Sequence, residues 1–159
     1  MLSEWITFGL YVGLLGLLSV YGVHRIWLLL ILRRGKAVHT TRSWRTLPTI
    51  TVQLPVFNEA PVIARLIDAV CALDWPAQRL QIQVLDDSTD QTTDLAQHAA
   101  AVWRDQGVDI QVIRRARRIG YKAGALAAGL KRARGEFIAI FDADFVPPAD
   151  FLHQLMPCF

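Results

Sequence analysis

Residues 5–23 form an unbroken run of nineteen uncharged residues, and a run of this kind has to be covered by protein or by lipid. As an α-helix it would measure roughly 28 Å, close to the thickness of a bilayer's hydrocarbon core. His24 and Arg25 follow the run, and apolar residues then continue to Leu32. A cleaved signal peptide fits poorly, because no basic segment precedes the run and no small-residue cleavage site follows it. The sequence therefore predicts a transmembrane anchor within residues 1–32.

Basic residues are concentrated directly after this predicted helix. Residues 33–47 contain five of them and no acid, whereas the segment before the helix carries only Glu4 as a charged side chain. Positively charged flanks stay on the cytoplasmic side of a membrane, so we expect the N-terminus outside and the rest of the chain in the cytoplasm. Residues 33–47 have no clear apolar period. They are predicted to be a basic juxtamembrane linker along the lipid surface.

The distribution of the remaining charges argues against nucleic acid as a partner. The chain has a net charge of +3 and a pI near 9.2, but from Leu47 onward it has eleven basic and thirteen acidic residues. Eight of these basic residues fall within residues 114–134, where Tyr121 is the only aromatic residue. Nucleic-acid surfaces combine cations with several stacking aromatic side chains, so this segment favours a small phosphate-bearing ligand. The scattered cysteines and histidines indicate neither a disulfide framework nor a zinc site.

Short apolar runs alternate with amphipathic stretches from Leu47 onward. Four runs are predicted strands: residues 49–54, 81–85, 109–113 and 136–141. Three helices are predicted between them; Asn58 or Glu59 is expected to cap the first, and the last spans residues 122–134 with Gly135 as its C-cap. This alternation is typical of an α/β fold with parallel strands and right-handed crossovers.

In parallel α/β sheets, ligands bind at the carboxyl ends of the strands. Asp142 and Asp144 follow the fourth strand, and two carboxylates at this spacing can bind one divalent cation. Asp86 and Asp87 follow the second strand; for Asp86 a ligand contact is favoured over helix capping, and for Asp87 the two roles are evenly weighted. Acids beside a basic segment favour a nucleoside diphosphate ester, with Lys122 or an arginine offsetting the remaining phosphate charge. Most of the arginines are interpreted as a solvated or membrane-facing surface.

Three other enzyme classes are less consistent with these motifs. The chain has neither GxxxxGK[ST] nor GxGxxG, which disfavours a kinase or a nicotinamide-dependent enzyme. Residues 142–146 match the DxDx[TV] nucleophile motif of haloacid-dehalogenase-type phosphatases. That motif normally lies on the first strand of its domain, whereas here it follows the fourth. The phosphatase is therefore a remote alternative.

Four sequence blocks, taken together, resemble the processive family 2 glycosyltransferases, in particular the cellulose synthase-like and glucomannan synthase-like branch. The blocks are LPVFNE at residues 54–59, ALDWPAQRLQIQVLDDSTDQT at 72–92, RRARRIGYKAGAL at 114–126 and GEFIAIFDADFVP at 135–147. They occur in family order with family-like spacing. The YGVHR sequence at residues 21–25, within the predicted anchor, is also similar.

The resemblance implies a GT-A-type, Rossmann-like fold and an inverting transfer of a hexose from UDP-glucose or GDP-mannose to a growing β-linked polysaccharide. Mg²⁺ or Mn²⁺ is implied as the cofactor, and Asp142 and Asp144 as the metal ligands. The implied donor-binding residues are Pro55, Phe57, Asn58, Glu59, Asp86, Asp87, Lys122 and Asp142. The implied location is the inner or plasma membrane, or the Golgi membrane in a eukaryote, with the lipid bilayer and the polysaccharide acceptor as further partners.

The chain departs from the family pattern at its C-terminal end. The family's catalytic base, in a TED-like block, and its acceptor block QxxRW are both expected beyond Phe159, so no catalytic residue is assigned within the chain. Residues 48–159 are accordingly expected to be the N-terminal, donor-binding half of an incomplete GT-A domain, inactive alone. A non-catalytic, membrane-tethered nucleotide-sugar binder or assembly partner is the alternative.

Overall fold

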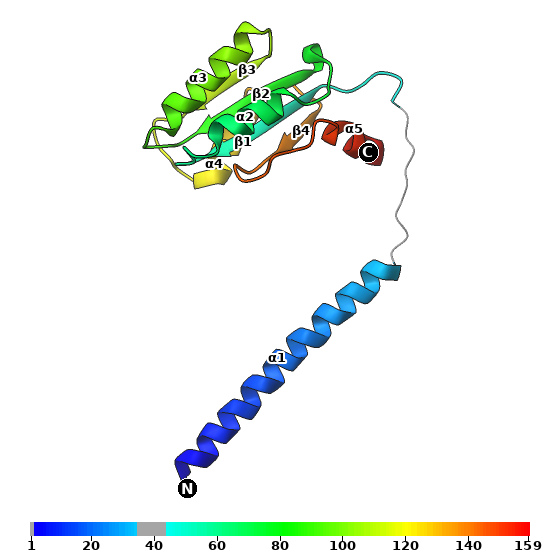
Figure 1. The fold of residues 1–159 in the computed structure, drawn as a ribbon, viewed down its shortest axis with the longest axis vertical. Helices are drawn as coiled ribbons and strands as arrows, with labels where there is room; N and C mark the ends of the chain where they lie inside the picture. Colours follow the sequence, from blue (N-terminus) through cyan, green and yellow to red (C-terminus); the bar gives the residue numbers. More distant parts are fainter. Residues whose placement is uncertain (1, 35–43) are drawn as a thin grey trace. The chain divides into compact units, whose positions relative to one another are not determined.

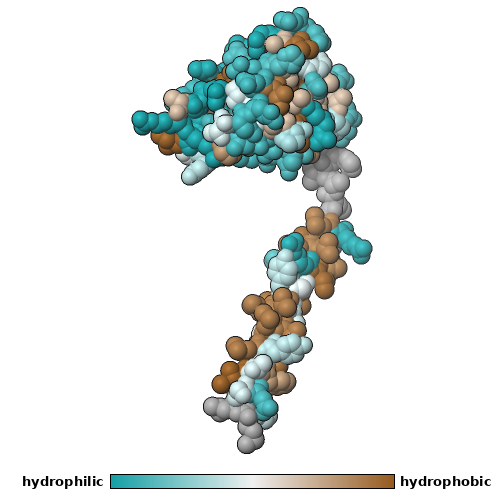
Figure 2. Space-filling model, turned by 60° about the vertical axis from the view of Figure 1, so that its left-hand side comes forward, coloured by the Kyte–Doolittle hydropathy of each residue, from teal (hydrophilic) through white to brown (hydrophobic). Residues whose placement is uncertain are grey.

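The computed structural model describes residues 2–34 and 44–159, and the chain divides into two compact units, residues 1–39 and 40–159. The first unit contains helix α1 (Leu2–Arg34), which is long and apolar enough to cross a membrane. Its large apolar side chains, from Trp5 to Leu32, are exposed, and Figure 2 shows hydrophobic surface along much of the helix. Two residues that were predicted to start the linker, Arg33 and Arg34, belong to α1 instead. Most of the predicted linker, residues 35–43, lies outside the described residues.

The second unit is built on a four-stranded parallel sheet (Figure 1). Its strands are β1 (Ile50–Val56), β2 (Leu80–Asp86), β3 (Ile110–Arg114) and β4 (Phe137–Ile140), in the order β3-β2-β1-β4. The α/β prediction is confirmed, and the strand ends differ from the predicted ones by one or two residues. The order places β1 in the middle of the sheet, beside both β2 and β4.

β1 continues through Pro55 to Val56, although the predicted strand ended at Leu54. Val56 O accepts a hydrogen bond from Asp87 N on the β2 side, whereas Gln53 O accepts one from Phe141 N on the β4 side. Alternation along the strand therefore turns the Pro55 nitrogen toward β4, and β4 pairs with β1 only as far as Gln53. No ladder hydrogen bond is lost at Pro55, so the strand continues past it.

The two faces of the sheet differ in polarity. Helices α2 (Ile63–Cys71) and α3 (Thr92–Asp105) pack on one face and share a core with Val52 and Leu54 of β1 and with Ile82 and Val84 of β2. Alternate residues point to the other face, where Gln53 Nε2 donates to Gln83 Oε1 at 3.0 Å. Helix α4 (Tyr121–Leu130) covers this polar face.

Helix α4 approaches the polar face closely because a glycine lies at the contact. A Cβ at Gly129 would lie 2.7 Å from Gln53 Nε2. The helix ends at Leu130, earlier than predicted, and Gly135 is not its C-cap; the Gly135 amide donates to Thr51 Oγ1 instead. After β4, the chain forms a short helix, α5 (Phe151–Leu155), which buries Leu152 in the main core.

Candidate functional site

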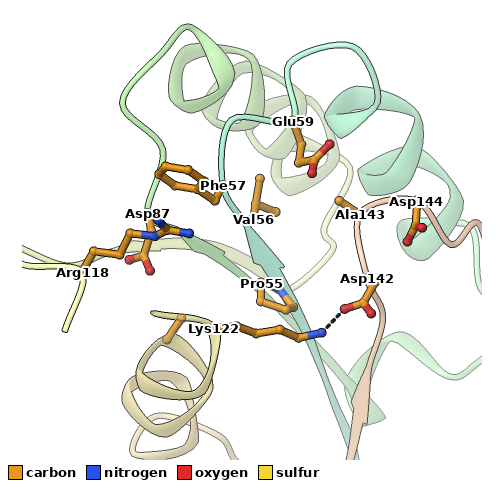
Figure 3. A pocket seen from close by; sticks show the side chains of 11 residues that line it. Pro55, Val56, Phe57, Glu59, Asp87, Arg118, Lys122, Asp142, Ala143 and Asp144 are labelled. Atoms are coloured by element: carbon orange, nitrogen blue, oxygen red, sulfur yellow. Dashed lines mark hydrogen bonds and ion pairs between the residues drawn. The ribbon is translucent and has the colours of Figure 1, made fainter. Parts of the chain in front are cut away.

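A pocket of about 430 Å³ lies at the carboxyl ends of β1, β2 and β4, beside the first turn of α4. In Figure 3, Phe57 and Arg118 lie at one end of the pocket, while Asp142 and Asp144 lie at the other. The structure thus brings together segments that follow different strands, at the edge of the sheet that the sequence predicted. The lining residues are Pro55, Val56, Phe57, Glu59, Asp87, Arg118, Lys122, Ala125, Asp142, Ala143 and Asp144.

Two residues from the sequence-based donor set, Asp86 and Asn58, do not line the pocket. The Asp86 side chain is fully buried; it accepts hydrogen bonds from Ser88 N at 2.9 Å and Thr93 Oγ1 at 2.7 Å, and it pairs with Arg114 Nε at 3.3 Å. The preference for Asp86 as a ligand contact is therefore corrected. Asp86 fixes the turn after β2 and the first turn of α3, and the adjacent Asp87 faces the pocket instead.

Asn58 joins the loop after β1 to the loop after β2. Its backbone has φ of 56°. Neither Asn58 nor Glu59 is the N-cap of α2, because the helix begins at Ile63 and Val62 occupies that position. The Asn58 backbone N–H donates to Ser88 Oγ at 2.9 Å, and the side-chain Oδ1 of Asn58 accepts from Thr89 N at 2.9 Å. These two hydrogen bonds form what we call the Asn58 clasp. It holds Phe57 and Glu59, the residues on either side of Asn58, in the pocket wall.

We expect Asn58→Ala to lower the free energy of unfolding by about 1–3 kcal/mol, because alanine loses the side-chain hydrogen bond with Thr89 N and is strained at a left-handed φ. Asn58→Asp retains an acceptor oxygen and should lose less. Thermal unfolding of the full-length protein, followed by tryptophan fluorescence, measures the difference. An Asn58→Ala protein as stable as the unsubstituted one would show that this side-chain hydrogen bond contributes nothing.

Asp87 is held at the pocket edge by Arg115. Arg115 Nε donates to Asp87 Oδ1 at 2.9 Å and Nη2 to the other carboxylate oxygen, so the guanidinium grips the carboxylate with two donors. The Arg115 side chain is 14% exposed and the Asp87 side chain is 6% exposed. The hydrogen bond to Asp87 raises the pKa of Arg115 above its ordinary value. Asp87 is thus a fixed, charged acceptor at the wall of the pocket.

The other end of the pocket combines two carboxylates with one ammonium group. Lys122 Nζ of α4 reaches across the pocket and pairs with Asp142 Oδ1, as the dashed line in Figure 3 shows, and both side chains are more than half exposed. Asp144 lines the same end. Within residues 2–34 and 44–159, no group of three or more His, Cys, Asp or Glu side chains is placed to hold a metal ion. Two carboxylates nevertheless fit Mg²⁺ or Mn²⁺, which draw their other ligands from substrate phosphates and water.

The sequence interpretation missed two pocket features in the basic segment. Arg118 lies over the Phe57 ring, with the guanidinium carbon 3.3 Å from the ring centroid. Arg115 is largely covered. The sequence interpretation assigned most of the arginines to a solvated or membrane-facing surface and did not single out these two. Nothing in the spacing of the arginines separates these two from their neighbours. The presence of an aromatic residue directly after β1, opposite a basic segment, was the available signal for the Arg118 contact.

The same chain was compared with known proteins. The sequence profile of Glycosyl transferase family 2 matches residues 51–158. Glucomannan 4-beta-mannosyltransferase 2 of Arabidopsis thaliana is 47% identical over 114 residues, covering 69% of this chain and 21% of that protein. Probable glucomannan 4-beta-mannosyltransferase 11 of Oryza sativa subsp. japonica is 49% identical over 114 residues, covering 69% and 20%. The chain thus spans about a fifth of the length of these relatives.

Solved structures share the fold. The mannosyltransferase PcManGT from Pyrobaculum calidifontis, solved in complex with GDP-Man and Mn²⁺, superposes with a TM-score of 0.62 and 31% identity over 73% of this chain and 35% of that one. TarS 1–349 of S. aureus, in complex with UDP-GlcNAc, gives a TM-score of 0.59 and 25% identity, covering 68% of this chain and 30% of that one. Together with the parallel sheet and the profile match over more than half of the chain, these findings establish that the chain belongs to glycosyltransferase family 2 and has a partial GT-A fold.

Proposed function

We propose that this chain supplies the nucleotide-sugar site of a membrane-bound, inverting glycosyltransferase that adds a hexose to a growing β-linked polysaccharide. The observation that carries the proposal is the pocket in which Asp142, Asp144 and Lys122 meet at one end and Asp87 lies in the wall. The names of the two plant relatives and the GDP-Man in PcManGT support GDP-mannose over UDP-glucose as the donor.

The diphosphate of the donor would occupy the end of the pocket that holds Lys122, Asp142 and Asp144. Asp142 and Asp144 would hold Mg²⁺ or Mn²⁺, which when bound supplies charge stabilisation for the departing nucleoside diphosphate. Lys122 and its ion-pair partner Asp142 are both more than half exposed. The ammonium group can therefore turn from Asp142 to a phosphate oxygen of the donor. Such a charge-assisted contact strengthens as negative charge develops on the leaving group.

The nucleoside would occupy the opposite end of the pocket. Asp87 is a carboxylate acceptor for a base N–H or a ribose hydroxyl, and Arg115 holds its orientation. Phe57 and Arg118 form a flat wall on which a base can lie. Pro55 and Glu59 complete the floor between the two ends.

The location of the protein is proposed from α1. A helix that is apolar around its whole circumference needs lipid or protein around it, and α1 exposes its apolar side chains. We place α1 across the inner or plasma membrane, or the Golgi membrane in a eukaryote, with the N-terminus outside and the α/β unit in the cytoplasm. The catalytic base and the site for the polysaccharide acceptor are proposed to lie outside residues 1–159.

Sugar transfer by the full-length protein in lipid nanodiscs tests this proposal. With Mn²⁺ present, we expect mannose from GDP-mannose to enter a β-linked product at least about tenfold faster than glucose from UDP-glucose, and EDTA to abolish the reaction. Faster use of UDP-glucose, or transfer that persists in EDTA, would contradict the proposal. A protein that binds both donors and transfers neither sugar would favour the non-catalytic alternative.

A further inference from the structure

Arg115 is the most extensively hydrogen-bonded side chain of the basic segment. Besides its two bonds to Asp87, Nη1 donates to Ile119 O at 2.8 Å and Nη2 donates to Tyr121 O at 3.1 Å. All three guanidinium nitrogens are therefore engaged. The planar guanidinium makes these four hydrogen bonds from three nitrogens in a fixed arrangement, whereas a lysine ammonium has three donors on one nitrogen and cannot make all four.

The two carbonyl groups belong to the turn that leads into α4. This turn is left-handed at two successive positions, with φ of 74° at Gly120 and 49° at Tyr121. A non-glycine residue at positive φ costs free energy and persists only where surrounding contacts impose it. Arg115 provides such contacts on both sides of Gly120. Lys122 directly follows Tyr121. The turn that Arg115 holds therefore also fixes the position of the Lys122 backbone.

A glycine on α4 makes room for this arrangement. A Cβ at Gly124 would overlap with the Ile119 carbonyl oxygen and would lie 2.6 Å from Arg115 Nη1. Arg115, the turn and the first turn of α4 are therefore in direct contact. The neighbouring Arg114 makes a different set of contacts, with Asp86 and with Ser88 O.

We propose that Arg115 is a positioning residue that couples the two ends of the pocket, Asp87 at the nucleoside end and Lys122 at the diphosphate end. This inference rests on the proposed function. A nucleoside that contacts Asp87 fixes the Asp87–Arg115 pair and, through Arg115, the turn before Lys122. The nucleoside and the diphosphate then both favour the same arrangement of this turn, so the two halves of a nucleoside diphosphate bind cooperatively.

A double-mutant cycle between Arg115→Lys and Lys122→Met tests the coupling. Arg115→Lys keeps a positive charge beside Asp87 but loses the fork, which guards against a simple folding failure. Calorimetry of the full-length protein with GDP and with UDP, each with Mn²⁺, gives the affinities. Arg117→Lys is the matched control, because Arg117 is an exposed arginine of the same segment outside the pocket lining.

We expect Lys122→Met to weaken nucleotide binding about tenfold in the presence of Arg115 and less than about threefold in the Arg115→Lys background. In the Arg117→Lys background the loss should stay at the tenfold level. If Lys122→Met costs the same factor with and without Arg115, the two ends are independent and the inference is wrong. If the unsubstituted protein binds neither GDP nor UDP, the proposed function itself fails.

Discussion

Asp144→Asn should lower sugar transfer by the full-length protein at least about a hundredfold, because the isosteric amide removes one of the two carboxylates available for the metal ion. Within the described parts of the chain, no third metal-binding side chain stands close enough to replace it. Loss of charge stabilisation on a leaving group of this kind costs about 3–4 kcal/mol of transition-state energy. The side chain is exposed, so the fold should be unaffected.

Asp105→Asn is the matched control for this prediction. Asp105 is an exposed aspartate at the end of α3, outside the pocket lining, and its substitution changes the net charge by the same amount. Initial rates of mannose transfer at saturating Mn²⁺ compare the two variants, and thermal unfolding checks that both are folded. An Asp144→Asn protein within about threefold of the control would remove the metal role assigned to Asp144.

Gly124→Ala should weaken nucleotide binding at least about tenfold and lower the free energy of unfolding by about 1–3 kcal/mol, because overpacking forces backbone to move. The atom that a Cβ meets is the Ile119 carbonyl oxygen, which belongs to the backbone and cannot rotate away as a flexible side chain can. Relief requires the turn before Lys122 to shift, and Arg115 would lose its bond to Ile119 O.

Ala123→Ser serves as the control for Gly124→Ala. It also adds one heavy atom, at an exposed neighbouring position of α4. GDP titration and thermal unfolding give both readouts. Unchanged affinity and stability in the Gly124→Ala protein would mean that the contact between α4 and the turn is loose, and would also weaken the argument for Arg115 as a positioning residue.

Alternation along the strands explains why adjacent aspartates have different roles. Asp86 has the same parity as Ile82 and Val84, which are buried against α2 and α3, so its side chain points to the covered face of the sheet. Asp87 comes one residue later and faces the pocket. The parity could be read from the sequence, and weighing it would have favoured Asp87 over Asp86 as the ligand contact.

The fold class and the edge of the sheet that carries the pocket could be predicted, because alternating strands and helices leave few topologies. The role of Asn58 could not, since its clasp depends on a positive φ and on loops about thirty residues apart. The distinction between Arg115, Arg118 and the exposed Arg117 also depends on three-dimensional contacts. The positive charge of this segment can be read from its sequence, but which group each arginine contacts depends on the fold.

We propose that a nucleotide sugar and a divalent metal ion bind together in this pocket. The most direct measurement is calorimetric titration of GDP-mannose into the full-length protein, with and without Mn²⁺, and into the Asp144→Ala variant. We expect binding at least about tenfold tighter with Mn²⁺, and no such enhancement in the variant, because the metal ion would need both carboxylates and the diphosphate. Equal affinity in all three titrations would contradict it.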